Sequence, residues 1–223
     1  MGIILNLETA TTNCSVGIAR EGRLLALKEN NSINYSHSEQ LHVFIKEVLD
    51  EASLSFTDIS AVAVSKGPGS YTGLRIGVSA AKGLCYALDI PLISVATLQS
   101  MAHQIAVTPD AYIVPMLDAR RMEVYSAVFD SNYQQIADTK AEIINEDSFN
   151  EWTQKSKVHF VGSGAEKCST LLDSPNLTFH PKALPSAKEM SALSWEKYAA
   201  ADFEDLAYFE PYYLKDFMLQ QKS

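Results

Sequence analysis

The sequence has few cysteines, no excess of basic residues and no long apolar run. Cys14, Cys85 and Cys168 are odd in number and far apart, which excludes a disulfide framework and predicts buried, reduced thiols in a cytoplasmic protein. The formal net charge is −9 and no Lys/Arg cluster stands out. Because phosphate neutralisation supplies most nucleic-acid affinity, the chain alone is expected to bind RNA or DNA poorly. No stretch approaches the length of a membrane span, so we expect no membrane contact.

Motifs for metal and nucleophilic chemistry are also missing. The five histidines show no HExxH or HxxxH spacing, and neither a Cys/His cluster nor a Gly-x-Ser-x-Gly elbow occurs. His37 and His42 are five residues apart on one predicted helix and so do not share a face. We therefore predict no metal, no cofactor and no catalytic residue, which argues against a metallopeptidase.

The sequence contains an internal duplication of one structural unit. A constant shift of 110 residues lays the segment 112–140 over the start of the chain, so that Leu7-Glu8 falls on Leu117-Asp118. Each copy reads as strand, carboxylate, strand, turn and strand, followed by a further strand and a helix. The order resembles the α/β, actin-like ASKHA (ribonuclease H-like) duplicated fold, with two lobes that each carry a mixed sheet flanked by helices. We expect the lobes to be residues 1–104 and 105–223, with the final segment packed back on the first lobe.

The two repeated acids, Glu8 and Asp118, mark the position of a nucleotide cleft in that architecture. Phosphate-binding hairpins need glycines so that backbone N–H groups can approach the phosphate, yet "TATTN" and "ARRME" follow the acids. We therefore predict a vestigial cleft, and a small ASKHA-type ATPase or kinase that uses the two acids is the alternative. The predicted cleft residues are Glu8, Thr9, Thr11, Thr12, Asp118, Arg120 and Arg121.

The stretch "SKGPGSYTGLRIG" at residues 65–77 looks like a phosphate loop but fails both the dinucleotide and the P-loop spacing. It predicts a tight turn into a helix over 72–88. That helix has two apolar stripes, and the second is small and almost uncharged: Gly73, Ile76, Gly77, Ala80, Gly83 and Ala87. Glycines inside a helix each cost up to about 1 kcal/mol, so a close approach of another backbone must compensate. The approaching helix is either the predicted helix over 36–52 or a partner's, and we favour a partner.

These residues carry a resemblance to a known family. The sequence "KGPGSYTGLRIGVSAAKGL", preceded by "SHSEQL" and followed by "MLDARRMEVY" and "PYYLKD", is similar to the bacterial TsaB (YeaZ) family. The likeness runs from residue 3 to about residue 217, and its glycine-rich element is the most specific part.

The resemblance implies a two-lobed pseudo-enzyme that pairs with the catalytic relative TsaD and, with the ATPase TsaE, helps to place threonylcarbamoyl on N6 of adenosine 37 in tRNAs that read codons beginning with A. It implies that tRNA is bound only through the complex and that the isolated chain forms a homodimer. The HxxxH metal site of TsaD is absent, since Leu98 and Ala102 stand at that spacing. The helices over 36–52 and 70–88 would form the partner and dimer interface, which adds Leu41, Phe44, Ile45 and Val48 to the small stripe.

Overall fold

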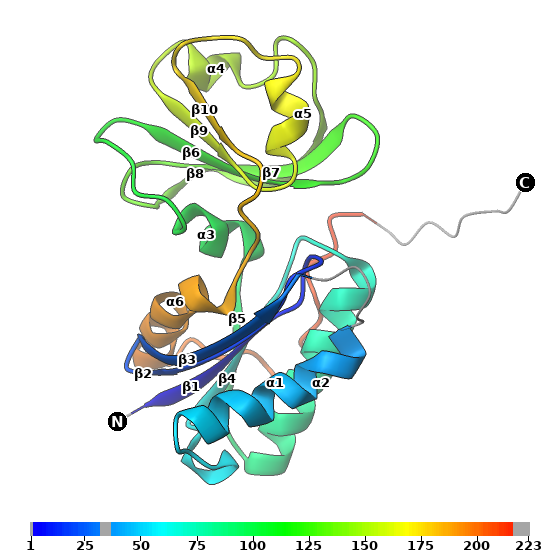
Figure 1. Cartoon of the computed structure of the whole chain (residues 1–223), viewed down its shortest axis with the longest axis vertical. Coiled ribbons are helices and arrows are strands. Elements are labelled where there is room, and N and C mark those ends of the chain that lie inside the picture. Colours follow the sequence, from blue (N-terminus) through cyan, green and yellow to red (C-terminus); the bar gives the residue numbers. More distant parts are fainter. Residues whose placement is uncertain (1, 32–36, 216–223) are drawn as a thin grey trace, which may run out of the picture.

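Two lobes make up the computed structural model, which describes residues 2–31 and 37–215 (Figure 1). Each lobe is built on one five-stranded sheet. The strands of the first sheet are β1 (Ile3–Glu8), β2 (Cys14–Arg20), β3 (Arg23–Asn30), β4 (Ala61–Ser65) and β5 (Leu92–Val95). Those of the second are β6 (Tyr112–Asp118), β7 (Glu123–Phe129), β8 (Gln135–Ile143), β9 (Val158–Val161) and β10 (Leu177–His180).

The two sheets have the same topology. Their orders are β3-β2-β1-β4-β5 and β8-β7-β6-β9-β10. In each sheet the first three strands form an antiparallel meander, and the remaining two run parallel to the first strand. The expected duplication and the mixed sheets are confirmed, because an offset of 110 residues carries β1, β2 and β3 onto β6, β7 and β8 to within about three residues.

Helices cover both faces of the first sheet. The helices of the described residues are α1 (His37–Glu51), the 3-10 turn η1 (Phe56–Asp58), α2 (Tyr71–Leu88), α3 (Thr97–Ala102), α4 (Asn150–Thr153), α5 (Ala165–Ser169) and α6 (Ala187–Ala199). Figure 1 shows α1 and α2 side by side on one face and α6 on the other. Apolar side chains of α1 and α2 join Leu5, Leu7 and Val62 in one core cluster. Met190 and Leu193 of α6 join Ile4, Ala63 and Ile93 in another.

One helix from each half of the sequence packs on the sheet of the other lobe. Leu98 and Met101 of α3 pack with Ile113 and Phe129 of the second sheet, although α3 precedes residue 105. Helix α6, which belongs to the second half of the sequence, packs on the first sheet. A division of the chain at residue 105 therefore describes the strands but not the helices, because each sheet needs an apolar cover on the face toward the other lobe.

The C-terminal segment after α6 lies along the first lobe. Glu204 forms a bridge with Leu92 of β5, and Lys82 of α2 donates to the carbonyls of Ala207 and Phe209. Further on, the Tyr212 N–H donates to the Lys66 carbonyl at 2.7 Å. The segment over 208–215 has no regular secondary structure.

The end of α3 differs from the end that the sequence predicts. The sequence "TLQSMAHQIA" at residues 97–106 predicts one helix, but α3 ends at Ala102. Ser36 and Glu39 have the spacing of a capping box for the helix over 36–52, but Ser36 lies outside the described residues. No helix of the described residues is long and apolar enough to cross a membrane.

Met190 offers a test of the helix exchange. Met190 is fully buried against the first sheet, so Met190→Ala should lower the free energy of unfolding by about 2–5 kcal/mol. Lys188→Ala, at an exposed position of the same helix, should change it by less than about 0.5 kcal/mol. Urea unfolding of both variants measures this, and equal values for the two would contradict the packing of α6 on this sheet.

Candidate functional site

The glycine-rich stretch forms a turn from β4 into α2, as predicted. Ser70 is the N-cap, and its hydroxyl accepts the Gly73 N–H at 3.3 Å. The helix ends at Leu88, followed by Asp89 in the left-handed conformation. This capping geometry explains where the helix begins and ends, and it leaves the glycines inside the helix to be explained by contacts.

Two of those glycines are explained within the chain. The loop after β1 lies directly on α2, where the Thr9 hydroxyl donates to the Gly73 carbonyl at 2.8 Å. A Cβ at Gly73 would lie 2.1 Å from the Thr9 carbonyl oxygen, and one at Gly77 would lie 2.3 Å from Thr9 Oγ1. Gly73 and Gly77 are buried and therefore unavailable to a partner. The prediction that they form part of the interface is corrected.

Gly83 is different. It is exposed, and a Cβ placed on it would meet nothing within 4 Å. Alanine at this mid-helix position would be more favourable by about 0.5–1 kcal/mol, so no contact in the described residues accounts for the glycine. Ala87, one turn further along the helix, is also exposed, and Ile76 and Ala80 are half-buried.

Helix α1 contributes less surface than the sequence suggests. Leu41, Ile45 and Val48 are 0%, 1% and 0% exposed and lie in the core of the first lobe. Their inclusion in the interface is corrected, because side chains that face their own sheet cannot contact a partner. Phe44 is half-buried, and Val43, which the sequence reasoning missed, is 51% exposed.

A shallow groove of about 550 Å³ runs between α1 and α2. Its sides are Ser38 and His42 from α1 and Arg75, Ile76, Ser79, Ala80, Gly83 and Leu84 from α2. Exposed Tyr86 lies beyond it on α2. The groove brings Ile76, Ala80 and Gly83 of the predicted stripe to one surface, which is small, weakly charged and suited to the close approach of another helix.

Glu8 does not face an open cleft. Its side chain is fully buried, and Oε1 accepts the Ala10 N–H at 2.6 Å and the Ser65 hydroxyl at 2.8 Å. Its Oε2 is buried without a hydrogen-bond partner in residues 2–31 and 37–215. Burial raises the pKa of the Glu8 carboxyl to about 7, against the lowering effect of the Ala10 N–H and the Ser65 hydroxyl. The arrangement makes Glu8 a support for the loop that follows β1.

Among the other predicted cleft residues, Thr9 is buried against α2 and Thr11 is half-buried, whereas Thr12, Asp118, Arg120 and Arg121 lie at the surface. Asp118 is exposed, and its Oδ1 accepts Lys167 Nζ at 2.7 Å and the Arg120 N–H at 2.6 Å. Arg120 and Arg121 are also exposed. On the first lobe, Thr12 donates to Asn31 Oδ1 and the Thr11 carbonyl lies 2.7 Å from His37 Nε2. The two acids therefore stand in unlike environments, one buried and one paired with lysine.

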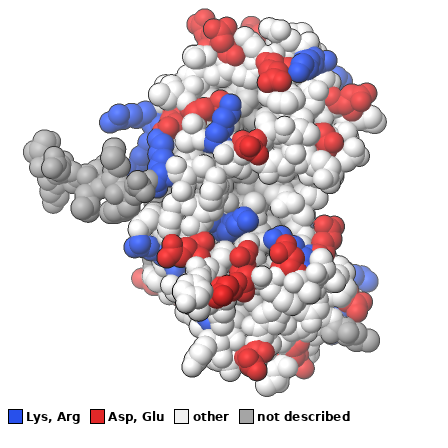
Figure 2. Space-filling model, turned by 180° about the vertical axis from the view of Figure 1, so that it is seen from behind, with Lys and Arg blue, Asp and Glu red and all other residues white. Residues whose placement is uncertain are grey.

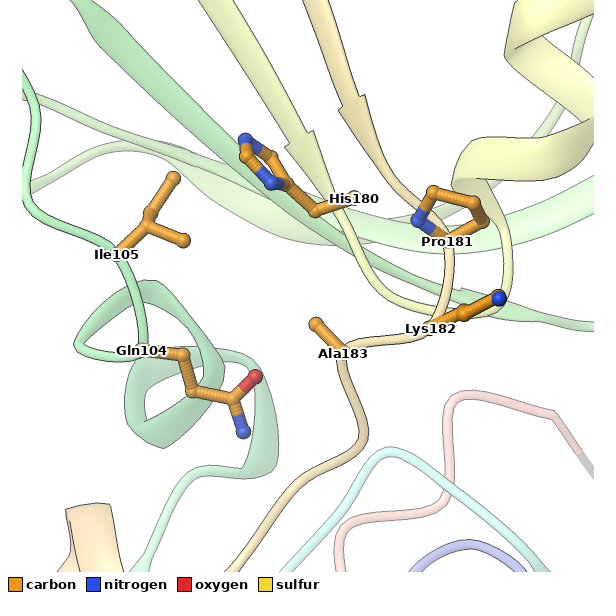
Figure 3. Close-up of a pocket in the computed structure, with 6 residues that line it drawn as sticks. All are labelled: Gln104, Ile105, His180, Pro181, Lys182 and Ala183. Atoms are coloured by element: carbon orange, nitrogen blue, oxygen red, sulfur yellow. The ribbon is translucent and has the colours of Figure 1, made fainter.

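A pocket of about 510 Å³ lies where the chain crosses between the lobes. Figure 3 shows Ile105 and His180 on opposite sides of it, Ile105 from the segment after α3 and His180 from the end of β10. Gln104, Pro181, Lys182 and Ala183 complete the lining, which contains no carboxylate. The described residues hold no group of three or more His, Cys, Asp or Glu side chains that could bind a metal.

The sequence reasoning missed two pairings. His159 Nδ1 and His180 Nε2 lie 3.3 Å apart on neighbouring strands. Arg75 lies over the ring of Tyr71, 4.0 Å from its centroid. No local spacing predicts the first, since the two histidines meet only through strand pairing, whereas the i, i+4 spacing of Tyr71 and Arg75 was visible in the sequence. The three cysteines are free and buried, as predicted, and burial raises the pKa of each thiol, to about 11 for Cys14 and Cys85 and about 12 for Cys168.

Comparisons with known proteins agree on one family. A family model described as "TsaD: tRNA N6-adenosine threonylcarbamoyltransferase" matches residues 31–218. The tRNA threonylcarbamoyladenosine biosynthesis protein TsaB of Escherichia coli (strain K12) is 30% identical over 96% of this chain and 94% of its own. The Haemophilus influenzae protein of the same name is 28% identical, over 96% of this chain and 93% of its own.

Solved structures share the fold. A Pseudomonas aeruginosa protein described as similar to peptidase YEAZ superposes with a TM-score of 0.84 at 23% identity, covering 96% of this chain and all of its own. The structure of YeaZ from Pseudomonas aeruginosa gives a TM-score of 0.80 at 24% identity, with the same coverage.

Glycines 73 and 83 should respond oppositely to alanine. Gly73→Ala forces a methyl group against a backbone carbonyl and should lower the free energy of unfolding by about 1–3 kcal/mol. Gly83→Ala relieves the helix and should raise it by about 0.5–1 kcal/mol. Urea unfolding of the two variants provides the measurement, and a destabilised Gly83→Ala variant would reveal an intrachain reason for that glycine.

Glu8 should make stability depend on pH. Folding raises the pKa of Glu8 above its ordinary value, so the folded state holds this proton more tightly than the unfolded state. The resulting stabilisation is present at acidic pH and is lost as the pH rises through about 7. The wild type should therefore lose about 2–3 kcal/mol relative to Glu8→Gln between about pH 5 and about pH 8. Parallel unfolding curves of the two proteins across that range would contradict this.

Proposed function

Because this chain belongs to the TsaB (YeaZ) family, on the evidence of the TsaD family model and of TsaB relatives aligned over nearly its whole length, we propose that it acts in the formation of tRNA threonylcarbamoyladenosine as a non-catalytic subunit. In this role it binds a TsaD-like catalytic subunit and supports the transfer of threonylcarbamoyl to N6 of adenosine 37 in tRNAs that decode ANN codons.

The observation that carries the proposal is the exposed glycine of α2. Gly83 costs helix stability, and apart from its chain neighbours and the adjoining helix backbone nothing lies within 4 Å of a Cβ placed there. A partner helix that packs closely against Ile76, Ala80, Gly83 and Ala87 explains the glycine, since a side chain there would keep the two backbones apart. The groove between α1 and α2 extends this surface, and Phe44 and Val43 border it from α1.

The state of the two repeated acids supports a role without catalysis. Glu8 is buried under its own loop, and Asp118 is paired with Lys167. Nucleotide hydrolysis of the ASKHA type needs both acids near Mg²⁺ and backbone N–H groups at the phosphates. Thr9 instead occupies the space beside α2, so the cleft is proposed to be vestigial.

The remaining partners follow from the same assembly. A TsaE-like ATPase would bind the joint surface of the two related subunits, and in isolation a second copy of this chain would occupy the α1 and α2 surface. All of these steps would take place in the cytoplasm, where tRNA is modified.

Gly83→Arg tests the proposed interface. The side chain has room in the isolated chain but would separate the packed helices, so co-purification with the TsaD relative and threonylcarbamoyl transfer by the pair should fall at least about tenfold. Loss of the homodimer in size-exclusion chromatography is expected as well.

Ala192→Arg is the matched control, since Ala192 is exposed on α6, on the opposite face of the sheet. It should leave partner binding unchanged. Normal binding by Gly83→Arg, with an unchanged unfolding curve, would place the interface elsewhere.

A further inference from the structure

A set of basic side chains from both lobes lies along the C-terminal segment, near the turn from β6 into β7. We call it the basic band; it consists of Arg75, which also borders the α1–α2 groove, and of Arg120, Arg121, Lys167 and Lys215. Arg75 lies on α2 of the first lobe, Arg120 and Arg121 on the β6–β7 hairpin of the second, and Lys215 at the end of the described chain.

The C-terminal segment brings these residues together. Arg75 stacks on Tyr71, and the Tyr71 ring lies 4.8 Å from that of Tyr213. Two residues later, Lys215 forms an ion pair with Glu123 at the base of the β6–β7 hairpin. This series of contacts fixes an arginine of the first lobe and a hairpin of the second on either side of one segment.

Two carboxylates near the band form ion pairs with its lysines, whereas its arginines form no ion pair with the described residues. Lys167 pairs with Asp118, and Lys215 pairs with Glu123. Arg75, Arg120 and Arg121 are exposed and form no ion pair with the part of the chain that the structure describes. The five basic groups therefore outnumber the two carboxylates that pair with them, in a protein whose formal net charge is −9. Figure 2 shows basic side chains gathered beside the end of the described chain, whereas elsewhere on that face the two signs are mixed.

The hairpin holds its arginines at an energetic cost. Arg120 and Arg121 have φ angles of 71° and 49°, and the left-handed region costs a residue with a side chain about 1–2 kcal/mol. Glycine or asparagine would make this turn with less strain. Backbone strain of this kind is concentrated at functional positions, and here it presents two guanidinium groups to solvent.

We propose that the basic band contacts the phosphate backbone of RNA, and, if the proposed function holds, the backbone of the tRNA that the complex modifies. Guanidinium groups bind phosphate oxygens in a bidentate manner and lose little entropy in doing so. Tyr71 and Tyr213 hold Arg75 in position, and the ion pairs of Lys167 and Lys215 fix the hairpin. The acidic remainder of the surface limits RNA contact to this band, so the affinity of the chain alone is low and depends strongly on salt.

The test compares two arginine pairs of equal charge. Arg120→Gln/Arg121→Gln removes two charges from the band. Arg20→Gln/Arg23→Gln removes two from the β2–β3 hairpin, at the opposite end of the first sheet. Binding of an unmodified tRNA transcript to the full chain is measured by fluorescence anisotropy from about 50 mM to about 200 mM salt. The band variant should bind at least about tenfold more weakly at the lower salt, with a salt slope reduced by about 1.5–2, and the control should stay within about twofold of the wild type.

Failure to detect tRNA binding by the wild type at the lower salt, or equal losses in the two variants, would overturn the proposal. Co-purification with the TsaD relative is measured in parallel and should be normal for both variants. If the band variant loses this partner and keeps its tRNA affinity, the band binds protein and the inference is wrong. If the wild type itself fails to bind the partner, the proposed function is wrong, while the RNA comparison still stands on its own.

Discussion

The contact between Thr9 and α2 determines how the first lobe is arranged. The Thr9 hydroxyl donates to a backbone carbonyl of the helix, and glycine at 73 and 77 lets the loop come this close. This contact places α2 against the end of β1, closes the space beneath the loop over Glu8, and leaves the opposite side of α2 at the surface. Both the absence of an open cleft beside Glu8 and the exposure of Gly83 follow from it.

The same constraint shows why duplication did not produce two equivalent sites. The sheets share their strand order and the position of the acid after the first strand. In the first lobe, the glycines of α2 let the loop sink inward and bury its acid. In the second lobe, Arg120 and Arg121 occupy the hairpin, and Asp118 stays at the surface beside Lys167. One fold thus carries a buried acid with a raised pKa in one copy and a surface ion pair in the other.

Much of the fold was predictable from the sequence because it depends on local patterns. Alternating and helical periodicity gave the strands and helices, and the offset of 110 residues gave the duplication. The candidate surface was only partly predictable. Helical periodicity finds apolar stripes but does not tell which one faces the chain's own sheet. The resemblance placed Leu41, Ile45 and Val48 in the partner interface, although they lie in the core. The glycines at 73, 77 and 83 look alike in sequence, and only the position of Thr9 separates them. The approach of Tyr213 to Tyr71, like that of His180 to His159, depends on contacts between distant segments.

The exchange of helices between the lobes affects the order in which the chain can fold during synthesis. All five strands of the first sheet have been made by residue 95, yet one face of that sheet is covered by α6, which begins at residue 187. Until then Ile4, Ala63 and Ile93 have no covering helix from their own chain. An apolar sheet face left open during translation is prone to aggregation or to contact with chaperones. The first lobe, although its strands are made first, is therefore completed only after α6 has been made.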